Sequence, residues 1–376
     1  MTYQICNRCV MDTSDSKIKF NEDGICDHCI TFDKEILPNW NYGINKQKEV
    51  KEIVKKIKKR SAGNEFDCIL GLSGGIDSSF LLHLVVTEYN LRPLVFHVDG
   101  GWNSQLATNN IEKLIDKLNL ELYTHVVNWN EMQDLQLSFF KSGVPHIDVP
   151  QDYAFFSTMY NFASKYNVKT IVTGGNFSTE CVRNPKEWMY YQSDTIQLKD
   201  IQKKHGKRKL KEYQLTNILW HKLWLPYIKG VKLIRLIDYM PYNKKEAENI
   251  LVNNYGFQTY PQKHFESRFT RFYESYWLYE RFGYDTRRVQ FSSLILTNQM
   301  TREEALKELE TAPYDKENII HEFEYVANKL NISTSELRNY FNMPLKTYCD
   351  YKNQENLYNL GAQVLKSLKI EKGGKR

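Results

Sequence analysis

The feature that most constrains the fold of this chain is an alternation of apolar runs and helical segments between residues 66 and 175. Short apolar runs predict strands at "FDCILGL" (66–72), "PLVFHVD" (93–99), "LYTHVV" (122–127) and "KTIVTGG" (169–175). The segments between them predict helices over about 77–89, 104–118 and 152–166. Such alternation is typical of an α/β fold with a parallel sheet covered on both faces, and "VKLIRLID" (231–238) is a candidate for its last strand.

The remainder of the chain is cysteine-rich at its beginning and helical at its end. We predict three regions, a cysteine module at 1–40, the α/β domain at 41–243 and a helical region at 244–376. Residues 183–230 predict loops and short helices. In the helical region, Thr301 and Ser333 each precede a glutamate by three residues, which is the spacing of a capping box.

Four of the seven cysteines form two Cys-x-x-Cys pairs at the beginning of the chain: Cys6, Cys9, Cys26 and Cys29. Two such hairpins bring four thiolates around one Zn²⁺ at about 2.3 Å each. Four cysteine ligands leave no coordination position open, so we predict a structural zinc ion that staples a segment with little core of its own. A redox-active pair is the alternative, and the doubled spacing favours zinc. We interpret His28, between the second pair, as a bystander.

A glycine loop separates the first predicted strand from the helix that follows it, in "LGLSGGIDSS" (70–79). Ser73, Gly74 and Gly75 leave backbone N–H groups without side-chain obstruction, and a helix that begins near Asp77 adds its own unpaired N–H groups. Together these donors predict an anion site of the size of a di- or triphosphate, to which the Ser73, Ser78 and Ser79 hydroxyls can donate. The loop is neither a Walker A motif nor a dinucleotide fingerprint, and its plain alternative is a tight strand–helix turn.

"SGGIDSS" resembles the signature loop of the PP-loop ATP pyrophosphatase superfamily, whose members cleave ATP between the α and β phosphates. The resemblance implies that the loop holds the departing pyrophosphate and that Asp77 helps to bind Mg²⁺. "FHVDG" (96–100) and "TGGN" (173–176) end later strands where this superfamily contacts ATP. The implied nucleotide-binding residues are Ser73, Gly74, Gly75, Asp77, Ser78, Ser79, His97, Asp99, Gly174, Gly175 and Asn176. Because ligands of open parallel sheets sit beyond the carboxyl ends of the strands, we expect these residues to converge.

Nearly the whole chain resembles the N-acetyl sugar amidotransferases of bacterial surface-polysaccharide synthesis, including lipopolysaccharide and O-antigen. The likeness is carried by "CNRCVMDTSD", the cysteine spacing over 20–29, the glycine loop, "TGGN", "KHFESRFTRF" (263–272) and "TREEAL" (301–306). It implies adenylation of an acetamido oxygen by ATP with release of pyrophosphate, then displacement of AMP by ammonia to give an acetamidino sugar. No cysteine has the setting of a glutaminase nucleophile, and the resemblance implies a separate glutaminase subunit, with a cyclase-like subunit as a further candidate.

The segment "KHFESRFTRFYESYW" (263–277) predicts a helix with a buried aromatic stripe and a basic face. We assign to the substrate or phosphate side Lys263, His264, Glu266, Ser267, Arg268 and Arg271. Lys263 and Arg268 join Ser73 and Asp77 as expected catalytic residues. A solvated basic face is the alternative for this segment, and Glu266 is a second candidate for Mg²⁺. Elsewhere, we interpret Cys68 and Cys181 as buried thiols, although Cys181 follows the "TGGN" segment closely enough for a catalytic role. A substrate role for Asp148 and Asp152 is a minor alternative to stabilising a helix start.

Composition narrows the class of protein without deciding its ligand. With 41% apolar and 26% charged residues the chain is typical of a globular protein, and its net charge of +6 suits an anionic ligand as well as a nucleic acid. "MTYQICNRCV" has no basic segment before an apolar core, and no apolar stretch is long enough to span a bilayer. We therefore expect a cytoplasmic protein that binds no membrane.

Two rival functions use the same motifs. A tRNA sulfurtransferase of the same superfamily also combines this loop with a cysteine knuckle, but the predicted catalytic domain has only Cys68 and Cys181, far apart in the sequence. A zinc-knuckle adaptor that binds nucleic acid needs exposed aromatic rings for base stacking. The aromatic residues here recur at helical spacing and are expected in the core, so nucleic acid is the less favoured partner.

Overall fold

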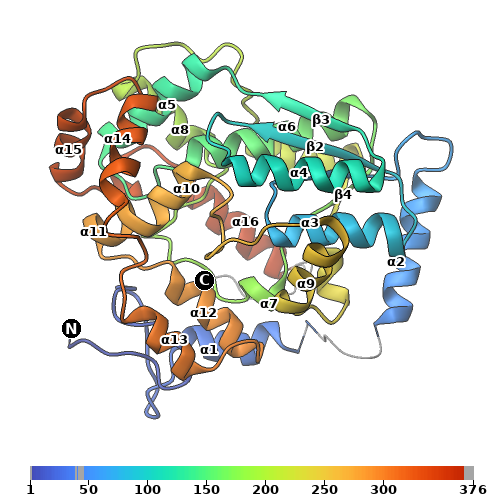
Figure 1. Cartoon of the computed structure of the whole chain (residues 1–376), viewed down its shortest axis with the longest axis horizontal. Helices are drawn as coiled ribbons and strands as arrows, with labels where there is room; N and C mark the ends of the chain where they lie inside the picture. The colour runs from blue at the N-terminus through green and yellow to red at the C-terminus, as the bar shows by residue number, and fades with distance from the viewer. Residues whose placement is uncertain (1, 39, 41–45, 368–376) are drawn as a thin grey trace.

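The fold is built on a parallel sheet of five strands in the order β3-β2-β1-β4-β5 (Figure 1). The computed structural model describes residues 2–38, 40 and 46–367. Its strands are β1 (Cys68–Gly71), β2 (Pro93–Asp99), β3 (Leu122–Val126), β4 (Thr170–Val172) and β5 (Lys232–Ile234). Every neighbouring pair is parallel, so the predicted α/β class is confirmed. The last strand is shorter than predicted, because the chain turns into a 3₁₀ helix at Leu236–Tyr239.

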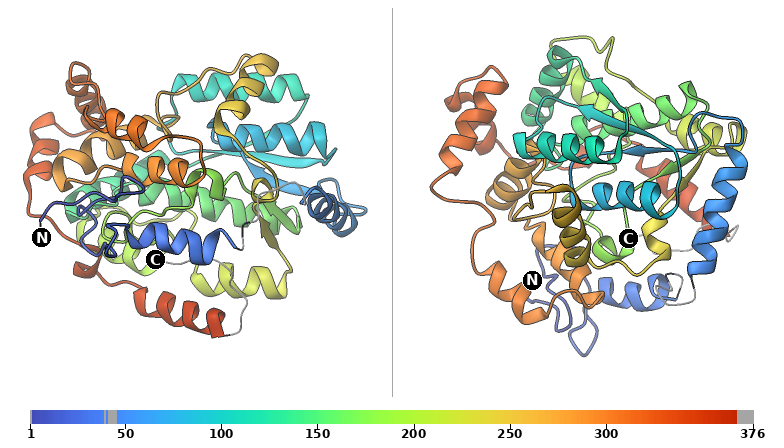
Figure 2. Two further views of the ribbon diagram at one scale, coloured as in Figure 1. Left: turned by 90° about the horizontal axis from the view of Figure 1, so that it is seen from below. Right: turned by 45° about the vertical axis from the view of Figure 1, so that its right-hand side comes forward.

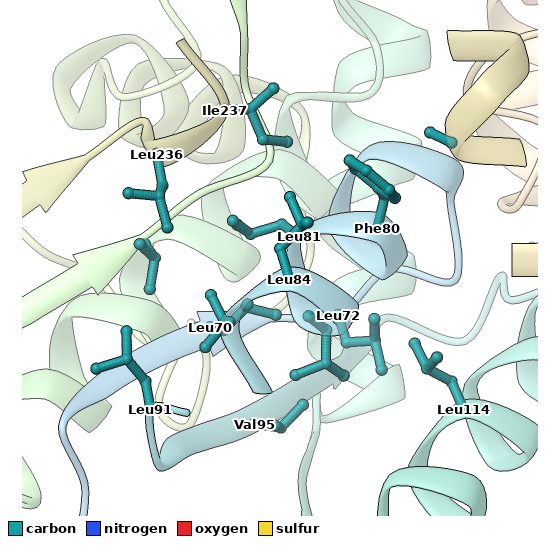
Figure 3. Packing of buried hydrophobic residues seen from close by; sticks show 14 of the residues in the cluster. Leu70, Leu72, Phe80, Leu81, Leu84, Leu91, Val95, Leu114, Leu236 and Ile237 are labelled. Atoms are coloured by element: carbon teal, nitrogen blue, oxygen red, sulfur yellow. The ribbon is translucent and has the colours of Figure 1, made fainter. Parts of the chain in front are cut away.

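Helices cover one face of the sheet around a hydrophobic core cluster. They are α2 (Gln47–Arg60), α3 (Ile76–His83), α4 (Gln105–Leu118) and α9 (Lys244–Tyr255). Because side chains alternate along a strand, Leu70 of β1 and Val95 of β2 point into this cluster, where they meet Leu81 of α3 and Leu114 of α4 (Figure 3). The predicted helix over 77–89 is α3 followed by a π-helical turn over Leu84–Glu88.

The opposite face of the sheet packs against α6 (Val149–Lys165) and an irregular π-type helix at Trp220–Ile228. Ile69 of β1, whose neighbours point the other way, contacts this second cluster together with Phe96 of β2 and Met159 of α6. Figure 2 shows the sheet between α3 and α4 on one side and α6 on the other. The predicted covering of both faces is therefore present.

A helical region flanks the sheet, as predicted for the end of the chain. Its α-helices after α9 are α10 (Arg268–Phe272), α11 (Leu278–Phe282), α12 (Arg287–Leu296), α13 (Arg302–Leu309), α14 (Ile319–Lys329), α15 (Thr334–Asn342) and α16 (Glu355–Ser367). The sequence patterns did not predict α5 (Trp129–Ser142), whereas α8 (Thr195–His205) falls in the stretch 183–230 for which short helices were expected, and both join the same core. Thr301 forms the complete predicted capping box with Glu304, whereas Ser333 provides only the N-cap half.

The cysteine module is held against the helical region. Arg302 at the start of α13 donates to the backbone carbonyls of Cys6 and Cys9, and Arg288 of α12 pairs with Asp12 at 3.1 Å. The first predicted domain boundary lies beside residues 41–45, which are outside the described residues, and both predicted boundaries stay predictions. Among the described residues, no helix is both long and apolar enough to cross a bilayer.

The strand order reverses between β1 and β4, and this reversal determines where the two following loops meet. The chain leaves β1 into α3 and leaves β4 into α7 (Phe177–Glu180). The backbone of Gly174, just after β4, lies directly against the start of α3. A Cβ atom at Gly174 would be 2.9 Å from the Ser78 nitrogen and 3.0 Å from the Asp77 carbonyl carbon. Only glycine fits there without displacing the first turn of α3.

Gly174→Ala is expected to destabilise the protein by about 1–3 kcal/mol, because the added methyl group overpacks a backbone contact. The matched control is Gly175→Ala, where the nearest atom to a new Cβ lies at 3.5 Å, an ordinary contact. Its expected change is within about 0.5 kcal/mol. Urea denaturation of both variants tests this difference, and equal stabilities would contradict the close approach of the two loops.

Candidate functional site

The glycine loop lies at the reversal point of the sheet and is shaped by one glycine. Gly74 has φ +85°, a conformation that favours glycine, and a Cβ there would be 2.9 Å from the Ala107 carbonyl oxygen. Gly75 is the N-cap of α3, and Ile76 is its first residue. The loop therefore turns sharply enough for the start of α3 to face the carboxyl edge of the sheet.

Several backbone N–H groups of this loop have no acceptor in the part of the chain that the structure describes: those of Gly74, Ile76, Asp77 and Ser78. Two other amides are occupied within the loop, since Gly75 donates to the Ser73 hydroxyl at 3.2 Å and Ser73 donates to the Ser78 hydroxyl at 3.3 Å. Unpaired amides at a helix start form an anion site. The Ser79 side chain is buried, and its hydroxyl has no partner among the described residues.

A lysine from the distant segment before α10 closes this site. The Lys263 ammonium lies 3.1 Å from an Asp77 carboxylate oxygen and 2.7 Å from one of Glu180, so it joins α3 to α7. Burial alone would lower the pKa of Lys263, but the two carboxylates raise it above its ordinary value. Burial would raise the pKa of Asp77, but Lys263 and the Tyr242 hydroxyl, which donates to the other carboxylate oxygen, hold it below its ordinary value. Both groups are therefore charged at neutral pH.

Glu266 places a carboxylate directly beside the loop. One of its oxygens lies 3.4 Å from the Ser73 hydroxyl, and a Cβ at Gly75 would be 2.8 Å from the same oxygen. Both oxygens of Asp77 already accept hydrogen bonds or pair with Lys263, so Glu266 has the freer carboxylate of the two candidates for Mg²⁺.

The other residues expected at the nucleotide are arranged around the ends of β2 and β4. His97 is buried, with one ring nitrogen 2.8 Å from the Leu72 carbonyl and the other 2.8 Å from the Asn103 amide. Asp99 accepts from the Gly101 N–H and the Asn103 side chain. Asn176 is completely buried, accepts from the Thr179 N–H and donates to the Gly174 carbonyl, so it shapes the loop after β4.

A cavity of about 620 Å³ is lined in part by Lys263, and residues 73–79 of the glycine loop are not among its lining residues. Its lining includes Thr179 and Glu180 of α7, the His264–Glu274 pair and four tyrosines, at positions 153, 160, 190 and 191. Arg183 and Lys186 contribute positive charge at another part of the lining. Cavities of roughly 300–1,000 Å³ are the size of small-molecule sites.

His264 is one of the few residues other than glycine with a left-handed backbone, at φ +66°. Its ring nitrogen lies 2.9 Å from a Glu274 carboxylate oxygen, and its side chain is 42% exposed. Burial lowers the pKa of the imidazole, but Glu274 raises it to about 9. His264 therefore carries positive charge at neutral pH, and this residue lines the cavity.

The predicted helix over 263–277 begins later than expected, at Arg268. Ser267 caps it by accepting from the Thr270 N–H, and the residues before it form turns and a loop. The aromatic stripe lies in the core, with Phe269 and Phe272 buried. Arg268 and Arg271 both pair with Glu322 of α14, at 3.0 and 2.6 Å, and neither lines the cavity. The structure thus gathers Lys263, His264 and Glu266 at the site and places the two arginines at a helix–helix contact.

The four cysteines of the knuckle converge as a tetrahedral site requires. All four sulfur atoms lie within 4.8 Å of one another, with Sγ–Sγ distances of 3.6 Å for Cys9–Cys26 and 3.8 Å for Cys6–Cys29. Bonds of about 2.3 Å in a tetrahedron give sulfur separations of about 3.8 Å, so the cluster fits one zinc ion. The Cys26 N–H donates to the Cys6 sulfur at 3.2 Å, a contact that stabilises a thiolate. His28 pairs with Asp15 at 2.9 Å.

The two remaining buried thiols lie apart from one another. Cys68 is fully buried in β1, and burial raises its pKa. Cys181 is also buried, 3.7 Å from the Ser293 carbonyl of α12, and burial raises its pKa to about 12. Neither thiol has the environment of a nucleophile.

Three site residues were not predicted from the sequence: Glu180, Tyr242 and Glu274. Glu180 follows "TGGN" by four residues, so its position after β4 is a signal that could have identified it. Tyr242 reaches Asp77 from the segment before α9, and nothing in the sequence pattern singled out Glu274.

Comparison with known proteins finds a family model that matches the C-terminal part of the chain. Residues 266–365 match the family described as "LPS biosynthesis protein WbpG-like, C-terminal domain". An uncharacterised protein of Methanocaldococcus jannaschii is 37% identical over 107 residues, which are 28% of this chain and 36% of that protein. The match thus spans about a third of that relative's length.

Solved structures show more distant likeness. The NH3-dependent NAD synthetase from Campylobacter jejuni is 15% identical, with a TM-score of 0.30, and the match covers 58% of this chain and 99% of that one. The U34-tRNA thiolase NcsA from Methanococcus maripaludis is 14% identical, with a TM-score of 0.34, over 93% of this chain and 97% of that one. Because these scores are low, the fold assignment depends on the sheet topology itself.

Cys26→Ser is expected to lose bound zinc and to lower the melting temperature by about 5 °C or more, because a structural zinc site contributes folding free energy. Cys349→Ser, which changes an exposed thiol outside the knuckle, is the matched control. Elemental analysis and thermal melts test both variants. Wild-type protein that contains no zinc and melts at the same temperature as Cys26→Ser would show that the knuckle is not a metal staple.

The His264–Glu274 pair is expected to make stability depend on pH. The pKa of His264 is raised to about 9 in the folded protein from about 6.5 in an unfolded chain, so its contribution is complete below about pH 6.5 and is lost as the pH rises through about 9. The stability difference between wild type and His264→Gln, measured by urea denaturation at pH 6, 7.5 and 9.5, should shrink with rising pH. A difference that grows toward pH 9.5 would contradict this assignment.

Proposed function

We propose that this protein is an ATP-dependent amidotransferase that activates the acetamido group of an N-acetyl sugar, in surface-polysaccharide synthesis, and replaces its oxygen with nitrogen. One observation carries the proposal: Lys263 joins the glycine loop, an anion site, to a cavity of small-molecule size. The match of residues 266–365 to a family described by lipopolysaccharide biosynthesis supports a sugar as the substrate.

In the proposed reaction the glycine loop holds the phosphates of ATP. The unpaired amides of Gly74, Ile76, Asp77 and Ser78 donate to the pyrophosphate half as it becomes a leaving group. Mg²⁺, held through Glu266 and supported by Asp77, would neutralise phosphate charge when bound. The Lys263 ammonium stands between loop and cavity, where it stabilises negative charge that develops on the α-phosphate.

The sugar occupies the cavity. Its acetamido oxygen attacks the α-phosphorus, pyrophosphate leaves, and the carbonyl carbon becomes an O-adenylyl imidate that ammonia can attack. Positioning of the two substrates is the main contribution of the protein, since this step needs no covalent enzyme intermediate. Tyrosine rings at 153, 190 and 191 and the charged pair His264–Glu274 provide the mixed apolar and polar lining that a sugar ring requires.

Ammonia in this proposal comes from a separate glutaminase subunit. Among the described residues, the two buried thiols have raised pKa values, and a glutaminase nucleophile needs a thiolate with an adjacent base. The same thiols also bear on the rival function of a tRNA sulfurtransferase. Sulfur transfer that relied on a pair of cysteines beside the loop is not favoured, since outside the knuckle Cys68 lies in β1, Cys181 is buried against α12 and Cys349 is exposed.

The direct test is incubation with ATP, Mg²⁺, an ammonium salt and a panel of UDP-linked N-acetyl sugars. The expected products are AMP, pyrophosphate and a sugar about one mass unit lighter, as NH replaces O. Lys263→Met should lower kcat/KM by about 100-fold or more, because it removes a charge placed at the reacting phosphate.

Lys204→Met is the matched control, since Lys204 pairs with Asp200 on α8 and does not line the cavity. Its activity should equal that of the wild type, and thermal melts check that both variants fold. Full turnover by Lys263→Met, or the absence of AMP with every sugar tested, would reject the proposed function.

A further inference from the structure

A carboxylate that the adenylation step leaves unused lines the cavity, and two more lie at the start of α6, the helix that contributes Tyr153 and Phe156 to the same lining. Asp148 and Asp152 lie at the start of α6, and Glu274 lies in the turn after α10. Thr270 donates to Asp148 at 2.7 Å, and the Gln192 amide, which lines the cavity, donates to Asp152 at 2.5 Å. Glu274 lines the cavity directly, paired with His264.

The charges of this group do not balance. Glu274 pairs with the His264 imidazolium, whereas neither Asp148 nor Asp152 forms an ion pair with a basic side chain among the described residues. Burial and the neighbouring Asp152 raise the pKa of Asp148 well above its ordinary value. Burial raises the pKa of Asp152 to about 7, against the lowering effect of His264. Since buried negative charge is costly without a partner, the cluster favours a cationic ligand.

A buried hydroxyl independently indicates that a ligand belongs here. The Tyr273 side chain is 1% exposed, and its hydroxyl has no hydrogen-bond partner among the residues that the structure describes. Tyr273 follows Thr270, which donates to Asp148, by one turn of the same helical run, so the two side chains lie on the same side of the helix. Burial raises the pKa of the Tyr273 phenol, and the negative charges of Asp148, Glu274 and Asp152 raise it further. Buried hydroxyls are almost always paired. Tyr273 therefore offers an unused donor and acceptor inside the cluster.

We propose that Asp152, Glu274 and the Tyr273 hydroxyl form the binding site for ammonium, the nitrogen donor of the reaction. This inference rests on the proposed function and adds the site of its third substrate. Ammonium provides both the positive charge that the carboxylates lack and N–H donors for their oxygens. Sugar hydroxyls would provide donors without charge. A divalent cation fits less well, because in the described chain only the four-cysteine cluster brings three or more potential ligands within metal-binding distance.

The same carboxylates provide a proton acceptor for the second step of the proposed reaction. Bound ammonium transfers one proton to the Asp152 carboxylate, which becomes a neutral acid. The electron pair released on nitrogen forms the C–N bond to the imidate carbon, and the C–O bond to AMP breaks with its electron pair leaving on AMP. A carboxyl group with a pKa of about 7 is matched to proton exchange near neutral pH. Because Glu274 and Lys263 line one cavity, nitrogen and imidate meet without crossing protein.

Two variants test the site, each with little steric change. Asp152→Asn keeps an acceptor for Gln192 and removes the charge. Tyr273→Phe removes only the unpaired hydroxyl, so it should not destabilise the fold. The expected result is a KM for ammonium chloride raised about tenfold or more in each variant, with the KM for ATP and for the sugar unchanged. Asp200→Asn and Tyr351→Phe, both outside the cavity, are the matched controls.

Sugar-dependent exchange of labelled pyrophosphate into ATP, measured without ammonium, separates this inference from the function on which it rests. Exchange by wild type and by both variants at equal rates, with raised KM for ammonium only in the variants, supports the ammonium site. Unchanged KM for ammonium rejects it while the adenylation activity stands. Lost exchange in the variants rejects it in favour of sugar binding at the cluster. No exchange by the wild type means that the proposed function itself is wrong.

Discussion

The contact of Lys263 with Asp77 and Glu180 is the interaction on which the rest of the site depends. Asp77 begins the helix after β1, Glu180 ends the short helix after β4, and Lys263 belongs to the segment before α10. These strands are neighbours whose connections diverge at the sheet reversal, where an open α/β sheet leaves a crevice. A single cation between two carboxylates brings both loops and the helical region to one point. Lys263 also links the anion site of the loop to the cavity, which it helps to line.

The four-cysteine knuckle supports the cavity by contacting the segment that lines it. Residues 182–193, which provide much of the lining, are anchored by contacts to the knuckle and to α12. The Trp188 ring nitrogen donates to the Ser14 carbonyl, and Ser16 donates from its backbone to Glu187. The Val182 N–H donates to Ser293 of α12, whose neighbour Ser292 accepts from Val10. A metal in the knuckle would thus stiffen a wall of the cavity although it lies at the far end of the sequence.

The features that could be predicted from the sequence are those that depend on a local pattern of residues. The strands and helices between 66 and 175, the capping box at Thr301 and the four-cysteine cluster follow from periodicity and spacing, and the structure contains them. Contacts between distant segments could not be predicted this way. Arg268 and Arg271 have the composition of a phosphate site, but Ser267 starts the helix so that both reach Glu322. Nothing in the sequence pattern singled out Glu274, and only the fold shows that a π-helical turn over Tyr273–Trp277 places it at the cavity.

In the proposed reaction, the two charged substrates need separate places. Ammonium and the phosphates of ATP attract one another, and in a shared site the cation would be held at the phosphates, away from the carbon that it has to reach. Here Lys263, held by two carboxylates, is the cation that pairs with the loop, while Glu274 lines the cavity in its pair with His264. An acetamido group placed between Lys263 and Glu274 would present its oxygen to the phosphate and its carbon to the nitrogen. In this proposal the fixed charges keep the nitrogen donor away from the phosphates, so that it is available to the carbon of the imidate.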